Sequence, residues 1–380
     1  MHFFIFGDKD ATIYSGGTTS SRNTGADEIL EINKSVAQNG SVQNVSRVLI
    51  QFDYTDISAS VQSGKIPSTA KYYLNLYDAS SEELSRTQNL FAYMVSGSEW
   101  TEGDGKLDDD PVTTNGVSYQ YRNQDETTSW FTGSLHSSQY EVSSSVTLTK
   151  ATRDVRLDVT DLVNNHIYSS SVYPNRGFIL KRQSITPTDR TFKFNSGSDS
   201  TNDESDSTRL GNLKFFSTET HTIYPPKLEV MWDDSSWNTG SASSPLTKLS
   251  STDLERLKVY FKNLKEEYKE DSVVKFRVAG RELYPTTTFA TTPAELDVKV
   301  LPSASAFYSV RDADTEEVII PFGTGSKISC DTSGNYFNLM MNGLQAERNY
   351  RFCIKVISGS NTTDEQINFY DDDYEFRVVR

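Results

Sequence analysis

The stretch Arg47-Val48-Leu49-Ile50-Gln51-Phe52-Asp53 carries apolar side chains at every second position, with Val48, Ile50 and Phe52 on one side of an extended chain. Successive side chains of a β-strand point to opposite faces, so this spacing predicts a strand with one buried face. The run 71–77 repeats the pattern with tyrosine and leucine. We therefore expect a sheet built from short, half-buried strands.

Other parts of the first domain show the same alternation. Further strands are predicted at 90–95, 155–159, 178–181, 191–194 and 228–232. Polar stretches such as 15–25 and 196–207 separate them and are typical of loops. Residues 160–167 begin with Thr-Asp and then place apolar residues three to four apart, which predicts one short helix. Many short strands with polar connections indicate an antiparallel jelly-roll sandwich over residues 1–234.

A change of composition indicates a second domain. Residues 235–251 are rich in Ser, Thr and Gly and poor in apolar residues, which is typical of a linker. A smaller domain is expected over 252–380. Its first segment, 253–268, fits either a helical face or a strand. We favour the strand because the alternating run 273–278 can pair with it.

The rest of the second domain also has the pattern of a β-sandwich. Strands are expected at 307–310, 317–322, 336–341 and 350–357. The spacing from Leu344 to Tyr350 resembles the tyrosine corner of fibronectin-type sandwiches, where a Tyr hydroxyl bonds the backbone a few residues upstream. We therefore expect an immunoglobulin- or fibronectin-like fold here.

Charge and hydrophobicity exclude two classes of partner. The chain has 37 Lys and Arg against 52 Asp and Glu, a net charge of −15 that repels phosphate and argues against nucleic-acid binding. No apolar run approaches the roughly 20 residues of a membrane helix, so we expect no membrane contact. The apolar run Phe3 to Phe6 is shorter than the roughly 7 to 15 residues of a signal-peptide core, so residues 1–6 are predicted to be a strand without an export signal.

Several blocks, taken in order, resemble the DNRLRE-type jelly-roll family. These blocks are residues 46–53, 98–103, 155–163, 176–181 and 226–230, and the similarity covers roughly residues 8–234. The family includes secreted surface proteins, carbohydrate-binding modules and structural proteins of tailed phages. The segment from Trp100 to Trp130 is similar to virion proteins of T4-like phages.

The resemblance and the missing export signal together imply a virion protein that is made in the host cytoplasm. Such a protein would dock in several copies, as a homo-oligomer or within a symmetric assembly, onto other tail, neck or head proteins. The alternative that the family implies is a carbohydrate-binding module that attaches to host glycans.

Four aromatic residues are candidates for that alternative. Trp100, Tyr119, Tyr121 and Trp130 lie among polar residues, and flat rings beside polar groups are suited to holding sugars. The competing interpretation is that Trp100 and Trp130 anchor a long loop onto the sandwich or fill a contact between subunits.

No arrangement typical of catalysis is found. The histidines His2, His136, His166 and His221 lack metal-ligand spacing. Asp104 and 108–110 form an acidic loop that could attract calcium, but its spacing is not that of an EF-hand, and a solvated loop is favoured. Cys330 and Cys353 are predicted to be free buried thiols. We expect a noncatalytic protein without catalytic, cofactor-binding or metal-ligating residues.

Overall fold

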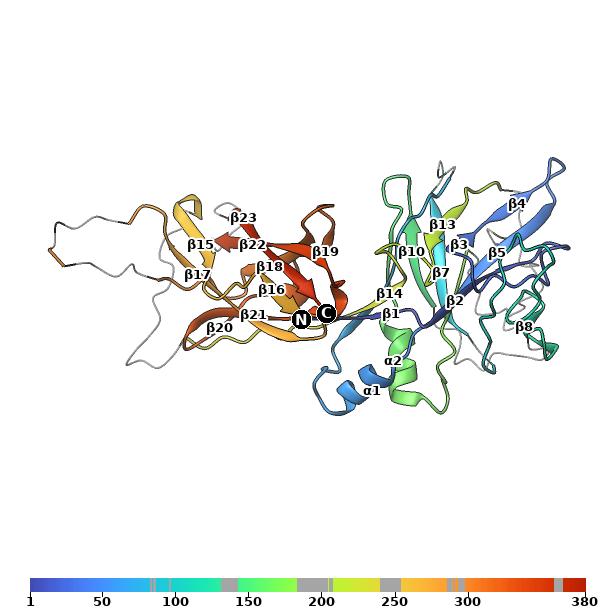
Figure 1. The fold of residues 1–380 in the computed structure, drawn as a ribbon, viewed down its shortest axis with the longest axis horizontal. Helices are drawn as coiled ribbons and strands as arrows, with labels where there is room; N and C mark the ends of the chain where they lie inside the picture. Colours follow the sequence, from blue (N-terminus) through green and yellow to red (C-terminus); the bar gives the residue numbers. More distant parts are fainter. Residues whose placement is uncertain are drawn as a thin grey trace. The chain divides into compact units, whose positions relative to one another are not determined.

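The computed structural model describes residues 1–82, 84, 87–95, 97–130, 143–182, 204, 208–239, 254–285, 289, 291–292, 298–358 and 365–380. Its regular structure is mainly β, in several sheets whose strand pairs are almost all antiparallel, which confirms the all-β class (Figure 1). The strand predicted at 191–194 and His136 lie outside the described residues. Within these ranges, no helix is both long enough and apolar enough to span a bilayer.

The chain folds into two compact units. Ile5–Val230 form the N-terminal unit, and Met231–Arg380 together with Met1–Phe4 form the C-terminal unit. This division differs from the expected one, which placed residues 1–4 in the N-terminal domain. They belong to the C-terminal unit, because Phe4 is buried in its core.

The first residues of the linker expected over 235–251 are not a linker in the structure. Ser236 accepts a backbone hydrogen bond from Cys330 and Asn238 donates one to it, each at 2.9 Å, so the first residues of this stretch belong to the C-terminal unit. From residue 240 onward the stretch lies outside the described residues.

The N-terminal unit contains most of the chain's strands and both of the described α-helices. Its strands are β1 (His2–Phe6, shared with the C-terminal unit), β2 (Lys9–Tyr14), β3 (Ile29–Ile32), β4 (Lys34–Val36), β5 (Val42–Gln51), β6 (Lys71–Leu76), β7 (Gln88–Met94), β8 (Tyr121–Asn123), β9 (Thr128–Ser129), β10 (Ser143–Leu148), β11 (Val155–Asp158), β12 (Phe178–Lys181), β13 (Leu213–Phe216) and β14 (Lys227–Met231). The two main sheets have the orders β1-β14-β6-β11 and β10-β7-β12-β5-β2. In addition, β4 pairs with β5, β13 with β3, and β8 with β9.

Strand β5 is more deeply buried than its sequence pattern predicts. Residues 45–50 are buried on both faces, whereas one buried face was expected. The reason is that the second face is also covered, because Leu49 on that face packs in a buried cluster with Trp100 and Trp130. Arg47, on that second face, forms an ion pair with the buried side chain of Glu204.

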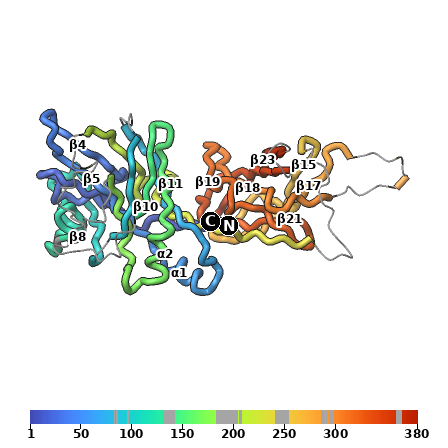
Figure 2. Tube along the Cα trace, turned by 180° about the vertical axis from the view of Figure 1, so that it is seen from behind, coloured from blue at the N-terminus to red at the C-terminus, as the bar shows by residue number. Residues whose placement is uncertain are grey.

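Two helices lie side by side at one edge of this unit (Figures 1 and 2). The helix predicted at 160–167 is confirmed as α2 (Thr160–Ser169). Helix α1 (Thr55–Gln62) was not predicted, because its β-branched residues and its single buried residue, Ile57, give no clear helical stripe. Just before the helix, Asp53 accepts hydrogen bonds from the backbone nitrogen and the hydroxyl of Thr55, the first helical residue, at 2.9 and 2.6 Å.

The C-terminal unit is formed by two sheets. Its strands are β15 (Leu257–Phe261), β16 (Glu267–Lys269), β17 (Val273–Glu282), β18 (Ala306–Asp312), β19 (Val318–Ile320), β20 (Ser329–Asp331), β21 (Gly334–Met340), β22 (Arg348–Ser358) and β23 (Gln366–Val379), with 3-10 turns at Leu254–Arg256, Thr324–Ser326 and Met341–Gly343. The sheet orders are β15-β17-β21-β20 and β16-β23-β22-β18-β19, and β16 pairs with β23 in parallel. The strand favoured within 253–268 is confirmed, because β15 pairs antiparallel with β17 and aligns Phe261 with Val278.

Aromatic side chains fill the space between the two sheets of the C-terminal unit. The ring of Phe352 lies 4.8 Å from that of Phe276 and 4.7 Å from that of Phe376, measured between centroids. Phe4 packs into the same cluster, directly over Gly343, where an added Cβ atom would overlap its ring. Residue 343 must therefore stay without a side chain for Phe4 to occupy this position.

Candidate functional site

The aromatic residues proposed for sugar binding are mostly buried. Trp100, Tyr119 and Trp130 are at most 9% exposed and pack in one cluster with residues of β2, β5 and β12. The indole nitrogen of Trp100 donates to the carbonyl of Arg176 at 2.9 Å, and that of Trp130 donates to the carbonyl of Ser118 at 2.7 Å. Tyr121, in β8, is half-buried. These indoles anchor the 97–130 loop and do not offer open ring faces to a sugar.

Asn23 fixes the same loop from inside. Its side-chain nitrogen donates to the carbonyls of Glu102 and Val117, and its oxygen accepts from the backbone nitrogens of Gly25 and Gly105. One side chain thereby joins three segments of backbone. Its contacts leave little freedom for the loop to rearrange around a ligand.

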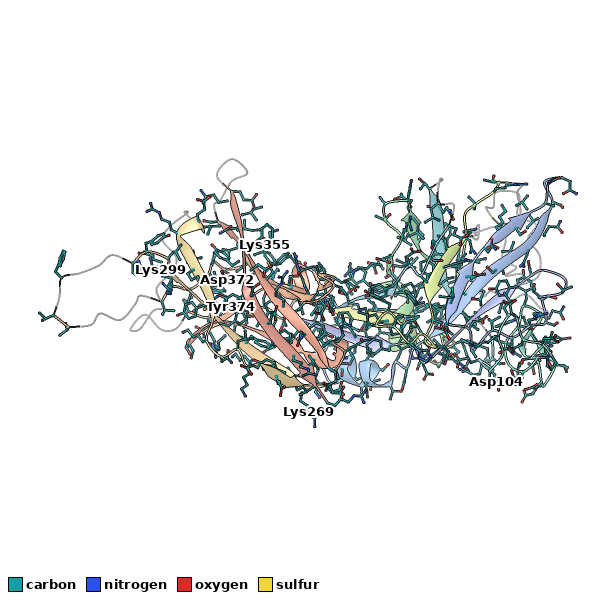
Figure 3. All side chains as sticks on the ribbon, turned by 45° about the horizontal axis from the view of Figure 1, so that its top comes forward. Asp104, Lys269, Lys299, Lys355, Asp372 and Tyr374 are labelled. Atoms are coloured by element: carbon teal, nitrogen blue, oxygen red, sulfur yellow. The ribbon has the colours of Figure 1, made fainter. Side chains whose placement is uncertain are left out.

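Two carboxylates of the acidic loop, those of Asp104 and Asp109, form hydrogen bonds within the loop itself. Asp109 accepts from the backbone nitrogen of Lys106 at 2.8 Å and from the hydroxyl of Thr113 at 2.7 Å, and these hydrogen bonds lower the pKa of its carboxyl group. Asp104, on the surface of the N-terminal unit (Figure 3), pairs with the side chain of Asn115. In the described ranges, no three His, Cys, Asp or Glu side chains are gathered as a metal site would require.

The histidines and cysteines lie in unrelated positions. His2 is buried in β1, His166 is half-buried in α2, and His221 is exposed in a loop. Cys330 and Cys353 are both buried and free, as predicted. Burial raises the pKa of each thiol, which keeps it protonated and unreactive at neutral pH.

Two carboxyl groups in the N-terminal unit have displaced pKa values. Asp10 is 1% exposed, and burial raises its pKa to about 8. Glu102 accepts a hydrogen bond from the backbone nitrogen of Asp10 at 2.8 Å, and burial raises its pKa to about 7. Raised pKa values are common at functional sites, but buried structural groups show them as well. Because Asp10 lies in β2 and its backbone nitrogen bonds Glu102 of the anchored 97–130 loop, we interpret both carboxyl groups as buried structural groups and not as a catalytic pair.

An exposed apolar surface lies on the five-stranded sheet of the C-terminal unit. We call it the β22–β23 face and define it by Phe307, Phe322, Lys355, Ile357, Ile367 and Phe369. Phe307, Lys355 and Phe369 stand opposite one another on three adjacent strands, and Ile357 stands opposite Ile367 in the next row. This register gathers apolar side chains that are far apart in the sequence.

The side chains of this face are packed against each other yet open to solvent. Phe369 is 54% exposed and Ile367 is 49% exposed. The ammonium of Lys355 lies 6.0 Å from the ring centroid of Phe307 and 5.9 Å from that of Phe369, and the ring of Phe322 lies 5.6 Å from that of Phe369. Contiguous exposed apolar patches of this kind commonly mark interaction sites.

The same strands carry negative charge next to the apolar side chains. Arg351 binds Glu316 and lies 3.4 Å from Asp371 and 3.9 Å from Asp373. Asp372, between them in sequence, forms an ion pair at 2.6 Å with Lys258, which belongs to β15 of the other sheet. Acidic groups outnumber basic groups at this end of the face. We therefore extend the β22–β23 face to include Glu316, Asp371 and Asp373, which we call its acidic half, and call the six residues named above its apolar half.

Sequence reasoning missed the β22–β23 face. The strand at 350–357 was expected, but β23, which supplies Ile367 and Phe369, was not. The alternation of Ile367 and Phe369 was the available signal. It was weak because the run of Asp371 to Asp373 interrupts the apolar period.

No protein-family model matches the chain, and a search of curated proteins also finds no similar sequence. The likeness to the DNRLRE-type family therefore stays a prediction from the sequence blocks. Function has to be argued from the residues and their geometry.

Proposed function

We propose that this chain is a noncatalytic structural protein of a tailed-phage virion, present in several copies and docked onto tail, neck or head proteins. The sequence resemblance suggests this role, and the strand topology of each unit is consistent with it. The observation that carries the proposal is the β22–β23 face, an exposed surface suited to a protein partner.

The strand order of the N-terminal unit supports a jelly roll. For this comparison we leave out β2 and the strands outside the two main sheets. The remaining strands are β1, β5, β6, β7, β10, β11, β12 and β14, which we number 1 to 8 along the chain. The two main sheets then run 1-8-3-6 and 2-7-4-5, with β2 added at an edge. This order matches that of two Greek keys folded as a jelly roll, and so supports the architecture expected of the DNRLRE-type family.

The C-terminal unit has features that support an immunoglobulin-like fold. We letter β15, β17, β18, β20, β21, β22 and β23 as A to G in chain order. The sheets then run A-B-E-D and G-F-C, and the second sheet has β16 added beside G and β19 added beside C. The hydroxyl of Tyr350, near the start of F, donates to the carbonyl of Gln345 at 3.0 Å, as in a tyrosine corner. Domains of this kind act widely as docking modules, which is an argument by analogy.

The chemistry of the β22–β23 face indicates the kind of partner. Its apolar half requires apolar side chains opposite, and its acidic half requires Lys or Arg opposite. In a two-fold contact centred on the acidic half, a second copy of this chain would bring its own Asp371 and Asp373 against the same carboxylates. We therefore propose a different virion protein, with an apolar centre flanked by basic residues, as the occupant of this face.

Purified particles test both parts of the proposal. The chain should be found in virions at a fixed copy number by quantitative mass spectrometry. Phe369→Asp should lower that number at least tenfold, because it places a charge in the apolar half. Val273→Asp is the matched control, since Val273 is 61% exposed on the other sheet of the same unit. Absence of the wild-type chain from virions would refute the function, whereas normal incorporation of Phe369→Asp would refute only the docking face.

The carbohydrate-binding alternative loses its first candidate residues. Trp100 and Trp130 are buried, so a sugar could not stack on them without unfolding the loop that they anchor. A sugar site in this chain would need exposed polar groups elsewhere.

A further inference from the structure

Basic side chains surround one tyrosine on the four-stranded sheet of the C-terminal unit. Alternate residues of β15 and β17, among them Val259 and Val278, pack in the core, so the residues between them point outward. We call these outward residues, together with the position that follows β15, the Tyr260 face. Its members are Lys258, Tyr260, Lys262, Arg277, Ala279 and Arg281.

The pairing of β15 with β17 places Tyr260 between two pairs of cations. On one side, Lys258 stands opposite Arg281 in the antiparallel register. On the other side, the backbone nitrogen of Lys262 donates to the carbonyl of Arg277 at 2.9 Å, which sets these two residues opposite each other. Tyr260 occupies the outward row between the two pairs, so a basic pair flanks it in each direction along the strands.

Two of these four cations are paired with carboxylates. Lys258 forms an ion pair with Asp372 at 2.6 Å. Arg277 and Lys275 donate to the same carboxylate oxygen of Asp331, at 2.7 and 2.8 Å. Because this single carboxylate faces two cations, one positive charge remains there.

The other two cations are open to a ligand. Arg281 donates to the backbone carbonyl of its neighbour Glu282 at 3.1 Å, and Lys262 is exposed. Within the described ranges, neither of them forms an ion pair. Among the outward positions of the four strands of this sheet, all of which are described, Asp331 alone is acidic.

The net charge of the chain does not cancel this local charge. The sequence argued against nucleic-acid binding because the chain carries −15. Charges are screened over about 8 Å at physiological ionic strength, so a phosphate on the Tyr260 face senses mainly the groups beside it. There, the four cations and Lys275 make five basic groups against two carboxylates, those of Asp331 and Asp372. In the sequence, acidic residues within 266–271 separate the two groups of cations.

The ring of Tyr260 is open in a way that a neighbouring tyrosine is not. On the adjacent strand β21, the ring of Tyr336 is covered, because the ammonium of Lys275 lies 3.7 Å and the guanidinium of Arg277 lies 5.4 Å from its centroid. Tyr260 is half-buried, and in the part of the chain that the structure describes its ring has no cation over it and no aromatic neighbour. Aromatic side chains on a basic surface are platforms on which unpaired bases stack.

We infer that the Tyr260 face binds single-stranded nucleic acid. One base stacks on the ring of Tyr260. Lys262, Arg277 and Arg281 hold the phosphates on either side of it. A single strand can lie along a flat sheet with its bases turned outward, whereas a duplex keeps its bases stacked and is read by elements that enter a groove.

The open ring is the observation that favours a nucleic acid over an acidic protein. Carboxylates of a protein partner could pair with the same cations, but they would leave the ring of Tyr260 without a partner. Nucleic-acid binding goes beyond the proposed docking function and does not depend on it.

Fluorescence anisotropy of the full chain with a labelled oligo-dT of about 12 nucleotides tests the inference. Binding should be seen at about 0.05 M salt, and a plot of log affinity against log salt should have a slope of about −2, because three cations contact phosphates. Lys262→Gln and Arg281→Gln should each make the slope shallower by about 0.7. Tyr260→Leu should weaken binding about tenfold without changing the slope, because it removes stacking but no charge.

Two variants are matched controls. Lys269→Gln removes an exposed charge from β16 in the other sheet of the same unit (Figure 3). Tyr168→Leu removes a tyrosine that is 56% exposed on α2 of the N-terminal unit. Both should bind oligo-dT with the affinity and the salt dependence of the wild type.

Three results would overturn the inference. The first is no change in anisotropy when the wild type is added to oligo-dT. The second is the wild-type slope in both Lys262→Gln and Arg281→Gln, which would place the phosphates elsewhere. The third is wild-type affinity in Tyr260→Leu, which, with equally tight binding of heparin, would make the face a site for polyanions without bases.

Discussion

The guanidinium of Arg47 lies 2.8 Å from the carboxylate of Glu204, and each side chain is only 2% exposed. Arg47 also lies over the ring of Tyr119, 5.7 Å from its centroid. Arg47 keeps Glu204 ionised, because the nearby positive charge lowers the pKa of the carboxyl group against the opposing effect of burial. The ion pair thus links β5 to a residue more than 150 positions further along the chain.

Removing one partner of this ion pair should be strongly destabilising. Glu204→Gln leaves a buried guanidinium without its counter-charge, so we expect a loss of about 3–5 kcal/mol in the free energy of unfolding. The double variant Arg47→Met with Glu204→Leu should recover most of this loss, because apolar groups need no counter-charge. Urea unfolding of the single and double variants measures both values. A Glu204→Gln variant as stable as the wild type would contradict the ion pair.

Asp10 should make the protein less stable as the pH rises. Its pKa is about 8 in the folded state, compared with 3.8 for an ordinary Asp, so the folded state holds the extra proton between these values. Unfolding releases that proton, and the free energy of unfolding must therefore fall from about pH 4 to pH 8. Burial is the main cause, and the charges of Glu102 and Glu219 add to it.

Asp10→Asn should remove much of this pH dependence. The variant cannot ionise, and we expect it to be roughly 2 kcal/mol more stable than the wild type at pH 8 but not at pH 5. Thermal unfolding followed by circular dichroism across this range measures the difference. Asp8→Asn, two residues away and exposed, should keep the wild-type profile. Parallel profiles for the wild type and Asp10→Asn would contradict the assignment.

Phe4 should stabilise the C-terminal unit even though most of that unit comes more than 200 residues later. Phe4→Ala leaves a cavity in the aromatic core and should cost about 3–5 kcal/mol. Hydrogen exchange should then quicken in β21 and β22. Phe6→Ala is the control, because Phe6 lies in the same strand but is 39% exposed, and it should cost less than about 1 kcal/mol. Unchanged exchange in Phe4→Ala would show that Phe4 is not part of this core.

The hydroxyl of Tyr350 should contribute modestly to the stability of the C-terminal unit. Tyr350→Phe removes the hydrogen bond to Gln345, and we expect a loss of about 1 kcal/mol, seen as a lower urea midpoint. Tyr284→Phe, at a residue that is 79% exposed, should leave the midpoint unchanged. Equal midpoints for both variants would mean that the corner contributes no stability.

Trp100 should act through stability and not through ligand contact. Trp100→Ala removes a buried ring and the hydrogen bond to Arg176, so we expect a loss of about 3–5 kcal/mol. Calorimetry measures it as a lower unfolding temperature. A variant with unchanged unfolding temperature and selectively lost sugar binding would restore the original sugar hypothesis for this residue.

Local periodicity was sufficient to predict much of the fold. Val48, Ile50 and Phe52 identified β5 because alternation is a property of neighbouring residues. The pairing of β15 with β17, and the hydrogen bond of Tyr350, also depend on residues close in sequence. These features required no knowledge of which distant segments meet.

Features that depend on distant contacts were not predictable in the same way. The burial of Trp100 depends on β2, β5 and β12, and the β22–β23 face depends on a register between three strands. The Tyr260 face was missed because acidic residues within 266–271 separate its two groups of cations in the sequence. In each case, single-sequence patterns identify the residues but not the neighbours that give them a role.

The position of Phe4 also has a consequence for protein synthesis. Phe4 leaves the ribosome more than 200 residues before the strands that bury it, because these lie within Met231–Arg380. Domains generally fold in the order in which they are made, so the N-terminal unit is complete while Phe4 still lacks its neighbours. An apolar side chain must therefore remain without its core throughout translation of Ile5–Val230 and beyond. A pause in translation within Met231–Arg380 would lengthen the time that Phe4 spends without its core.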